Sequence, residues 1–155
     1  MSKKIIFYGI CLFFLLSALG YARDFTFVNI NAALSDLWYQ TNYHTFPNTL
    51  SFLETFSYNQ LYQLKWLLTV VVSLLFLLIY ILGIYLIFKK KKYIVWSLAC
   101  FAFIYLISGI FYMYGYFFND LARGYKFSRI FMGFIQSPLL LMLLIPAFIL
   151  GKEVE

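Results

Sequence analysis

Residues that could act as nucleophiles or proton acceptors are few in this chain of 155 residues, which has two cysteines, Cys11 and Cys100, and one histidine, His44. A thiolate nucleophile needs its base within about 3 Å. The topology inferred below puts Cys100 roughly 12 Å inside a membrane span, whereas His44 and Arg123 lie outside the membrane. A membrane enzyme that uses Cys100 is therefore a disfavoured alternative, and we predict no catalytic residue.

Metal and cofactor chemistry lack a supporting motif. The sequence contains no CxxC pair, no HExxH motif and no glycine-rich phosphate-binding loop. A zinc site needs three or four ligands, and His44 stands alone in a segment rich in Tyr and Asn. We therefore predict no metal and no cofactor.

Three cations stand at regular spacing before the last apolar run of the chain. Arg123, Lys126 and Arg129 follow one another at three-residue steps, and Asp120 lies one step earlier. On a helix these three cations would share one face about 120° wide. Two interpretations remain open: an interfacial anchor whose long side chains reach the lipid headgroups, or a face that contacts an acidic or polar partner.

The apolar run that follows is interrupted by Gln136, Pro138 and Pro146. Each proline lacks an amide, so the carbonyls of Phe134 and Met142 lose their helical donors. Hydroxyls, water or neighbouring helices usually satisfy such groups in a membrane. We therefore expect these three residues to be packing positions in a helix bundle, with close approach at Ser108, Gly109 and Gly115 of the preceding span.

The composition identifies the environment of these residues. Hydrophobic residues make up 64% of the chain and charged residues 12%, and the mean hydropathy is +0.85. A soluble fold of this length could not bury so much apolar surface, whereas a bilayer accepts runs of about 20 apolar residues. The net charge of +6 does not indicate nucleic-acid binding, because four of the twelve cations form the single run Lys89–Lys92.

The apolar runs predict an all-α integral membrane protein with four transmembrane helices, or three if the first is a cleaved signal peptide. The predicted segments are these: an anchor or signal peptide, 1–22; an external polar and aromatic segment, 23–65, with a surface helix from about residue 50, where Ser51 to Glu54 matches a capping box; a span, 66–88; a turn of four lysines, 89–92; a span, 93–118; an external basic loop, 119–126; a proline-kinked span, 127–150; and a tail, 151–155.

The distribution of cations predicts the orientation of these spans. Lys and Arg resist translocation, so short loops rich in them stay in the cytoplasm. Lys3, Lys4, the run Lys89–Lys92 and Lys152 fall on one side, which is seven of the twelve cations. We therefore predict that both termini are cytoplasmic and that Arg123, Lys126 and Arg129 are external.

The C-terminal part of the chain carries a family resemblance. The words GYKFSRIF (124–131) and FIQSPLLLMLLIPAF (134–148) resemble the small membrane proteins associated with exosortases in Bacteroidetes, the exosortase-F-associated and exosortase-X-associated groups. The match covers about 30 residues, with a looser likeness in RDFTFVNIN and LYQLKW. The resemblance implies a bacterial inner-membrane protein that accompanies a protein-sorting or envelope-polysaccharide system.

Taken together, these patterns predict a non-enzymatic accessory or assembly subunit that contacts the lipid bilayer and a larger membrane protein. The candidates for partner contact are Asp120, Arg123, Lys126 and Arg129. A small oligomeric transporter or channel subunit is the alternative. The predicted spans of this chain contain no ionisable residue, so in a transporter Gln136 and the prolines would have to form the transport pathway.

Overall fold

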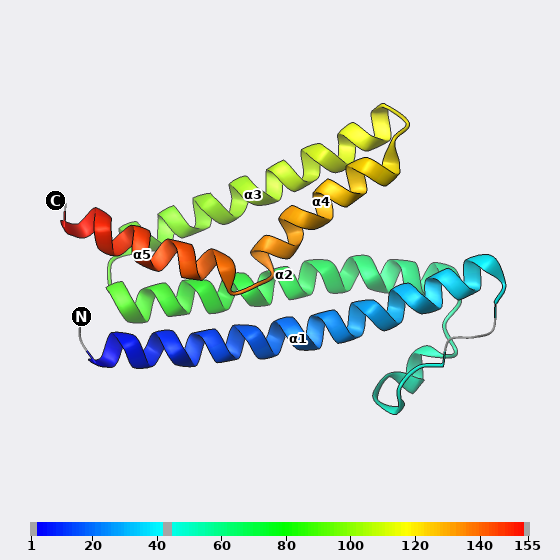
Figure 1. Ribbon diagram of the computed structural model, residues 1–155, viewed down its shortest axis with the longest axis horizontal. Helices are drawn as coiled ribbons and strands as arrows, with labels where there is room; N and C mark the ends of the chain where they lie inside the picture. The colour runs from blue at the N-terminus through cyan, green and yellow to red at the C-terminus, as the bar shows by residue number, and fades with distance from the viewer. Residues whose placement is uncertain (1–2, 42–44, 154–155) are drawn as a thin grey trace. The chain divides into compact units, whose positions relative to one another are not determined.

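The computed structural model describes residues 3–41 and 45–153, and every regular element in these ranges is a helix (Figure 1). The elements are α1 (Lys3–Tyr39), the 3₁₀ helix η1 (Asn48–Leu53), α2 (Tyr58–Phe88), α3 (Lys91–Phe117), α4 (Leu121–Ile135) and α5 (Leu139–Glu153). Three of them, α1, α2 and α3, are long and apolar enough to cross a membrane. The pair α4 and α5 passes the same test as one bent span. The chain is therefore an all-α membrane protein, as its composition predicts.

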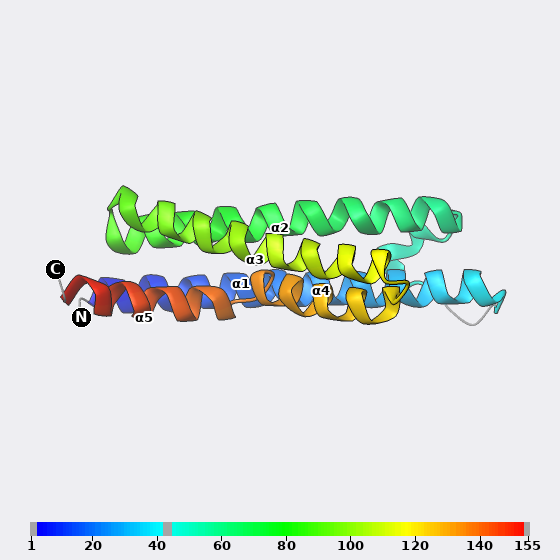
Figure 2. The same cartoon turned by 90° about the horizontal axis from the view of Figure 1, so that it is seen from above.

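The helices belong to two compact units. Unit 1 contains Met1–Ser17 and Ser73–Glu155, and unit 2 contains Ala18–Val72. The helices α1 and α2 each supply one part to each unit, whereas α3, α4 and α5 belong wholly to unit 1. Figure 2 gives a second view of the same helices.

Residues 23–65, which we predicted as one segment between two spans, are divided among α1, η1 and α2 in the structure. The helix α1 continues without a break to Tyr39, and α2 already begins at Tyr58. No Gly or Pro stands between Tyr21 and Tyr39, so nothing in the chain stops the helix there. It ends where Gln40 adopts a left-handed conformation, with φ of 55°, and the Thr41 amide donates to the Asp36 carbonyl at 2.9 Å, as in a Schellman motif.

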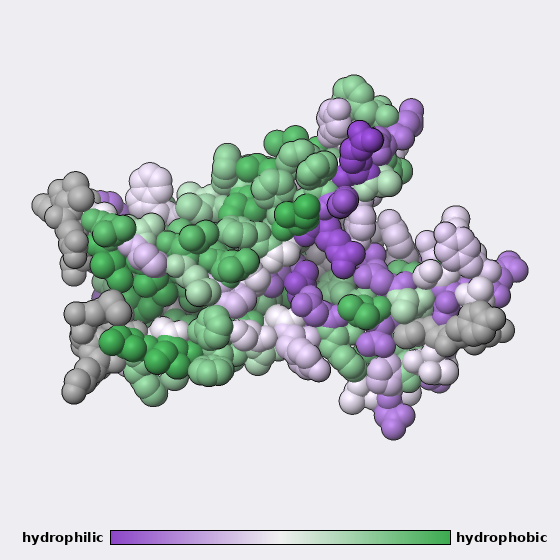
Figure 3. All heavy atoms as spheres, viewed as in Figure 1, coloured by the Kyte–Doolittle hydropathy of each residue, from purple (hydrophilic) through white to green (hydrophobic). Residues whose placement is uncertain are grey.

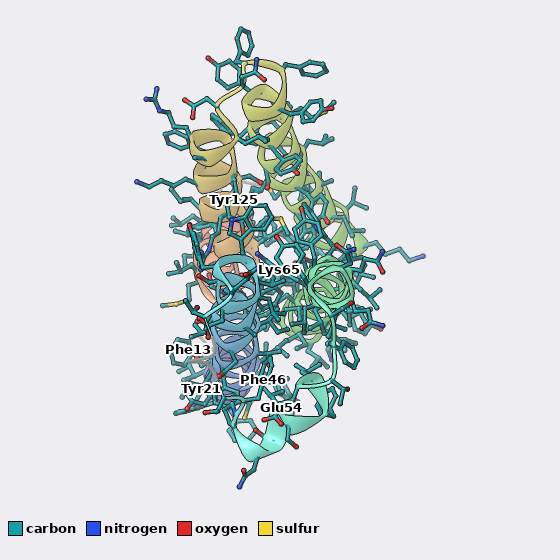
Figure 4. The ribbon with its side chains drawn as sticks, turned by 90° about the vertical axis from the view of Figure 1, so that its right-hand side faces the viewer. Phe13, Tyr21, Phe46, Glu54, Lys65 and Tyr125 are labelled. Carbon is teal, nitrogen blue, oxygen red and sulfur yellow. The ribbon has the colours of Figure 1, made fainter. Side chains whose placement is uncertain are left out.

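The apolar face of this extension explains why it stays helical. Ile30, Ala33 and Leu34 recur at helical spacing and are buried against Leu53 of η1 and Leu61 of α2. Packing of an amphipathic face supplies most of the stability of helices in proteins. Phe46 and Glu54 flank η1 at this end of unit 2, where Figure 4 labels both.

The helix expected from about residue 50 is in the structure the short 3₁₀ helix η1, and the α-helix that runs into the next span begins at Tyr58. The Ser51 hydroxyl donates to the Asn48 carbonyl at 3.1 Å and caps no α-helix. The helix start lies six residues further on, where the Ser57 amide donates to Gln60 Oε1 at 2.9 Å and the Leu61 amide donates to the Ser57 carbonyl at 3.0 Å. Ser57 and Gln60 thus form one half of a capping box, in which the Gln60 side chain accepts from the Ser57 amide, and the Ser57 hydroxyl also donates to Gln60 Oε1 at 3.1 Å.

In unit 1 the predicted external loop 119–126 shrinks to a tight turn. The Asp120 amide donates to the Gly115 carbonyl at 2.9 Å, and Asn119 has a left-handed φ of 55°. Asparagine tolerates this conformation better than most residues, so the sequence can close α3 and start α4 at Leu121. The three cations after it therefore lie on a helix and not in a loop.

The predicted kinked span 127–150 is two helices in the structure. The helix α4 ends at Ile135 and α5 begins at Leu139, with a bend of 57° between them. Pro138 stands just before α5, where a missing amide costs no helical hydrogen bond. Only Pro146 lies inside a helix.

The helices α3 and α4 approach each other at glycine. A Cβ atom on Gly124 would lie 2.6 Å from Gly115 Cα and 2.7 Å from the Phe111 carbonyl oxygen. The Ser108 hydroxyl donates to the Ser128 carbonyl at 3.0 Å, so Ser108 and Gly115 make the close approach that we predicted. A Cβ atom on Gly109 would meet nothing within 4 Å, and the prediction is wrong for this residue.

We predict that Gly124→Ala destabilises the protein by about 1–3 kcal/mol, because the new methyl group meets backbone atoms that cannot move aside singly. Gly133→Ala is the matched control on α4, since a Cβ atom there meets nothing within 4 Å. Because alanine has a higher helix propensity than glycine, Gly133→Ala should leave the stability unchanged or raise it by up to about 1 kcal/mol. The midpoint of thermal unfolding in detergent measures both. Equal midpoints for the two variants would contradict the close glycine contact.

Candidate functional site

Two groups of residues stand out in unit 1, and the first is a row of cations on α4. We call Arg123, Lys126 and Arg129 the basic stripe. Asp120 caps the helix before it: Oδ1 accepts from the Arg123 amide at 3.3 Å, and Oδ2 lies 3.2 Å from Arg123 Nε. The Arg123 side chain is 77% exposed, so this ion pair leaves the guanidinium open to further contacts.

The basic stripe lies opposite the face of α4 that packs on α3. That packing face is shown by the Ser108 to Ser128 hydrogen bond, by the stacking of Phe111 on Phe127 and Phe131 and by the glycine contact. With 100° of rotation per residue, the centre of the stripe is about 150° away from this face. Lys126 and Arg129 are exposed, and neither forms an ion pair with any residue that the structure describes. Figure 3 shows hydrophilic atoms in a row over α4.

The stripe reaches down into the membrane-spanning part of the protein. Arg129 follows Ser128, which contacts Ser108, and Ser108 lies nine residues before the end of α3. Nine helical residues rise about 13 Å, and the whole of α3 exceeds the hydrocarbon thickness of about 30 Å by roughly 10 Å. Arg129 therefore lies beside a level of α3 about 13 Å from the end of that helix, and Arg123 lies closer to the end.

The second group fills the break between α4 and α5. We call Ser73, Tyr80, Gln136 and Ser137 the polar node. Gln136 Nε2 donates to Ser73 Oγ at 2.5 Å. The Tyr80 hydroxyl lies 3.0 Å from the Ile135 carbonyl oxygen and also contacts the Ser137 carbonyl oxygen. Ser73, Tyr80 and Gln136 are each no more than 3% exposed.

The polar node supplies the donors that the helix break leaves missing. The Ser137 hydroxyl donates to the Phe134 carbonyl at 2.9 Å, and this is the carbonyl that Pro138 cannot reach. Side-chain hydroxyls therefore form hydrogen bonds to the carbonyls of Phe134, Ile135 and Ser137 in a part of the protein where water is scarce. The arrangement holds two half-helices together and exposes no reactive group.

The remaining sequence candidates do not join these groups. Pro146 is exposed on α5. Cys11 is exposed and Cys100 partly exposed, and His44 lies outside the described residues. Among the residues that the structure describes, no cluster of three or more His, Cys, Asp or Glu side chains could hold a metal.

Sequence reasoning missed Tyr80, Ser73, Ser137 and Gly124. Tyr80 carried a usable signal: it stands fourteen residues after Trp66 in an apolar run, away from either interface. Tyrosine prefers the ends of spans, and a buried hydroxyl needs a partner. A mid-span tyrosine therefore indicates a polar contact, although only the fold identifies the contacted carbonyls.

These helices define the class of the protein as a small all-α membrane protein. Comparison of the chain with protein-family models, with curated proteins and with solved structures finds no match.

We predict that Tyr80→Phe lowers stability by about 1 kcal/mol, because the helix break loses the one hydroxyl proton that the Ile135 and Ser137 carbonyls share. Tyr85→Phe on the same helix is the control, since the Tyr85 side chain is 53% exposed. Thermal unfolding in detergent, followed by circular dichroism, compares the two. A loss of stability in Tyr85→Phe as large as in Tyr80→Phe would show that the Tyr80 hydroxyl has no special role.

Proposed function

We propose that this protein is a non-enzymatic accessory or assembly subunit of a bacterial inner-membrane complex, and that it contacts a larger membrane protein through the basic stripe. The observation that carries the proposal is the exposure of Lys126 and Arg129 on the face of α4 turned away from α3. This face takes no part in the packing of α4 on α3.

The position of the stripe supports a contact with an acidic or polar surface. Charged groups near the membrane interior are costly unless they pair or reach the interface. Arg123 already has Asp120 as a partner, whereas Lys126 and Arg129 have no acidic partner among the described residues. Guanidinium groups bind carboxylates with two parallel hydrogen bonds, so an acidic residue near the end of a partner helix would match Arg129.

The inferred orientation supports the same proposal. Seven lysines near the termini and the α2–α3 turn favour the cytoplasmic side for that end of the chain. The stripe then faces the outside. The tendency of Lys and Arg to stay on the cytoplasmic side does not explain three cations there. A partner contact gives those cations a role.

The system to which the subunit belongs is proposed from the resemblance alone. The sequence segments that carry the resemblance, within residues 124–148, contain two of the three stripe cations, the helix break and most of α5. An exosortase-type protein-sorting or envelope system is the candidate that this likeness supports.

A transporter or channel subunit is the second candidate, and the helix break is the observation in its favour. Broken helices near the midplane carry binding sites in many transporters. In this protein the side chains at the break bond to nearby carbonyls and to one another, and this supports a packing role in preference to a pathway.

The orientation is testable by cysteine accessibility in a background with Cys11 and Cys100 replaced by Ala. We expect an impermeant maleimide to label a cysteine at Thr45 in intact cells and a cysteine at Lys91 only after the membrane is opened. Both single-cysteine variants should label fully after opening, which controls for reactivity. The reverse pattern in intact cells would place the basic stripe on the cytoplasmic side and contradict the proposal.

The contact is testable with two charge variants of the stripe. We expect Arg123→Lys with Arg129→Lys to weaken co-purification of the partner severalfold, because charge is kept but the planar donor geometry is lost. Replacement of all three cations by Gln should abolish it. Co-purified membrane proteins are quantified by mass spectrometry in mild detergent, at equal levels of each variant.

The other outcomes of this experiment are distinct. Partner retention in both variants would contradict the docking role and leave the stripe as an interfacial anchor. Loss in the Gln variant alone would indicate that general positive charge is enough. A Lys126→Arg variant, which keeps the charge and adds a guanidinium, serves as the control and should retain the partner.

A further inference from the structure

Unit 1 contains a second surface feature, an apolar groove at the end opposite the basic stripe. It lies between the N-terminal half of α1 and α5, and Ile87 near the end of α2 contributes to its wall. Its volume is about 750 Å³, within the range of about 300–1,000 Å³ that is usual for ligand pockets. Gly9, Phe13, Met142, Pro146 and Ile149 are among its lining residues, and Figure 4 labels Phe13 on α1.

Two residues keep this groove open. Gly9 has no side chain, and a Cβ atom placed on it would meet nothing within 4 Å. Pro146 on the opposite wall is exposed and extends no long side chain toward α1. Neither residue therefore fills the space between α1 and α5.

The groove has the length of one bilayer leaflet. On α1 it extends from Ile6 to Phe14, and on α5 from Met142 to Leu150. Eight helical steps rise about 12 Å, and half of the hydrocarbon core is about 15 Å thick. A single acyl chain that enters from the near membrane surface would therefore lie along the groove.

The sequence places lysines next to the segments that line the groove. Lys3 and Lys4 begin α1 just before Ile6, the run Lys89–Lys92 follows Ile87, and Lys152 follows Leu150. The start of α1, the α2–α3 turn and the end of α5 lie at the same end of unit 1 in both views (Figures 1 and 2). The only acidic residues in these stretches of sequence are Glu153 and Glu155.

We propose that this groove binds an anionic phospholipid, with an acyl chain between α1 and α5 and the phosphate among the lysines. An apolar groove with a cationic rim is complementary to an amphiphile with a negative head. Basic pockets between membrane helices are known to bind such headgroups.

A second copy of the chain fits the groove less well. Two copies inserted in the same orientation would bring their lysine-rich ends together at one membrane surface. Like charges placed together across an interface are unfavourable. The same lysines attract a phosphate, and this decides between the two occupants.

Photolabelling of the full chain tests the proposal. The protein is placed in phosphatidylcholine vesicles that contain a trace of phosphatidylglycerol, or of phosphatidylcholine, with a diazirine in the acyl chain. We expect phosphatidylglycerol to label residues 6–14 and 142–150 at least about threefold more than the phosphatidylcholine probe does. Gly9→Leu, which fills the groove, should reduce this labelling to the phosphatidylcholine level.

Gly20→Leu is the matched control, because Gly20 lies on the same helix and a Cβ atom there also meets nothing within 4 Å. It is absent from the groove lining and should leave the labelling unchanged. Unfolding midpoints of both variants, equal to or above that of the parent protein, verify the fold. If either midpoint falls, the smaller change Gly9→Val with Gly20→Val replaces the pair.

A second measurement separates headgroup from chain. Native mass spectrometry should detect one retained phosphatidylglycerol, and replacement of Lys89, Lys90 and Lys91 by Gln should remove it. Equal labelling by the two probes, or labelling insensitive to Gly9→Leu, would overturn the proposal in favour of bulk lipid. Retention of phosphatidylglycerol in the Gln variant would overturn headgroup recognition. Cross-linking between copies through a cysteine at Ile149 would identify a second chain as the occupant.

Discussion

Every backbone polar group inside the hydrocarbon must find its partner within the protein, because no water is present to replace it. The gap between Ile135 and Leu139 is where this constraint bears hardest on unit 1, since the carbonyls there have no complete helical ladder. Tyr80 and Ser137 supply donors to these carbonyls, and Gln136 extends the contact to Ser73 on α2. The bend between α4 and α5 is thus attached to α2 by hydrogen bonds buried from lipid.

The same constraint shapes the neighbouring contacts. The helix α4 can begin its return immediately after α3, because Asn119 accepts a left-handed conformation and the Asp120 amide satisfies the Gly115 carbonyl. Gly115 and Gly124 then let the two backbones touch, and van der Waals packing of this kind drives helix association where lipid is as apolar as the side chains. Packing on α3 uses one face of α4, so the cations occupy the other.

Positive charge consequently has two separate locations with different surroundings. The basic stripe follows one helix and descends past the level of Gly115, which suits contact with another protein. The second location is the lysine-rich end of unit 1, where the lysines are neighbours in sequence of the residues that line the apolar groove. A count of cations along the chain supports only an orientation, because the Coulomb interaction of each charge depends on what lies within a Debye length of it in space.

The sequence by itself determined the class of this protein and the periodicity of its stripe. Apolar runs of 20 or more residues require lipid, and three-residue spacing puts Arg123, Lys126 and Arg129 on one side of any helix that contains them. Local signals did not determine the helix boundaries: Ser51 to Glu54 and Ser57 to Gln60 carry equivalent patterns, and α2 begins only after the second. Only the tertiary structure decided that α1 continues to Tyr39, that Pro138 separates two helices and that the Tyr80 hydroxyl bonds to carbonyls at the break between α4 and α5. Each of these depends on contacts between residues far apart in the chain, such as Tyr80 and Ile135, whose energies no local pattern contains.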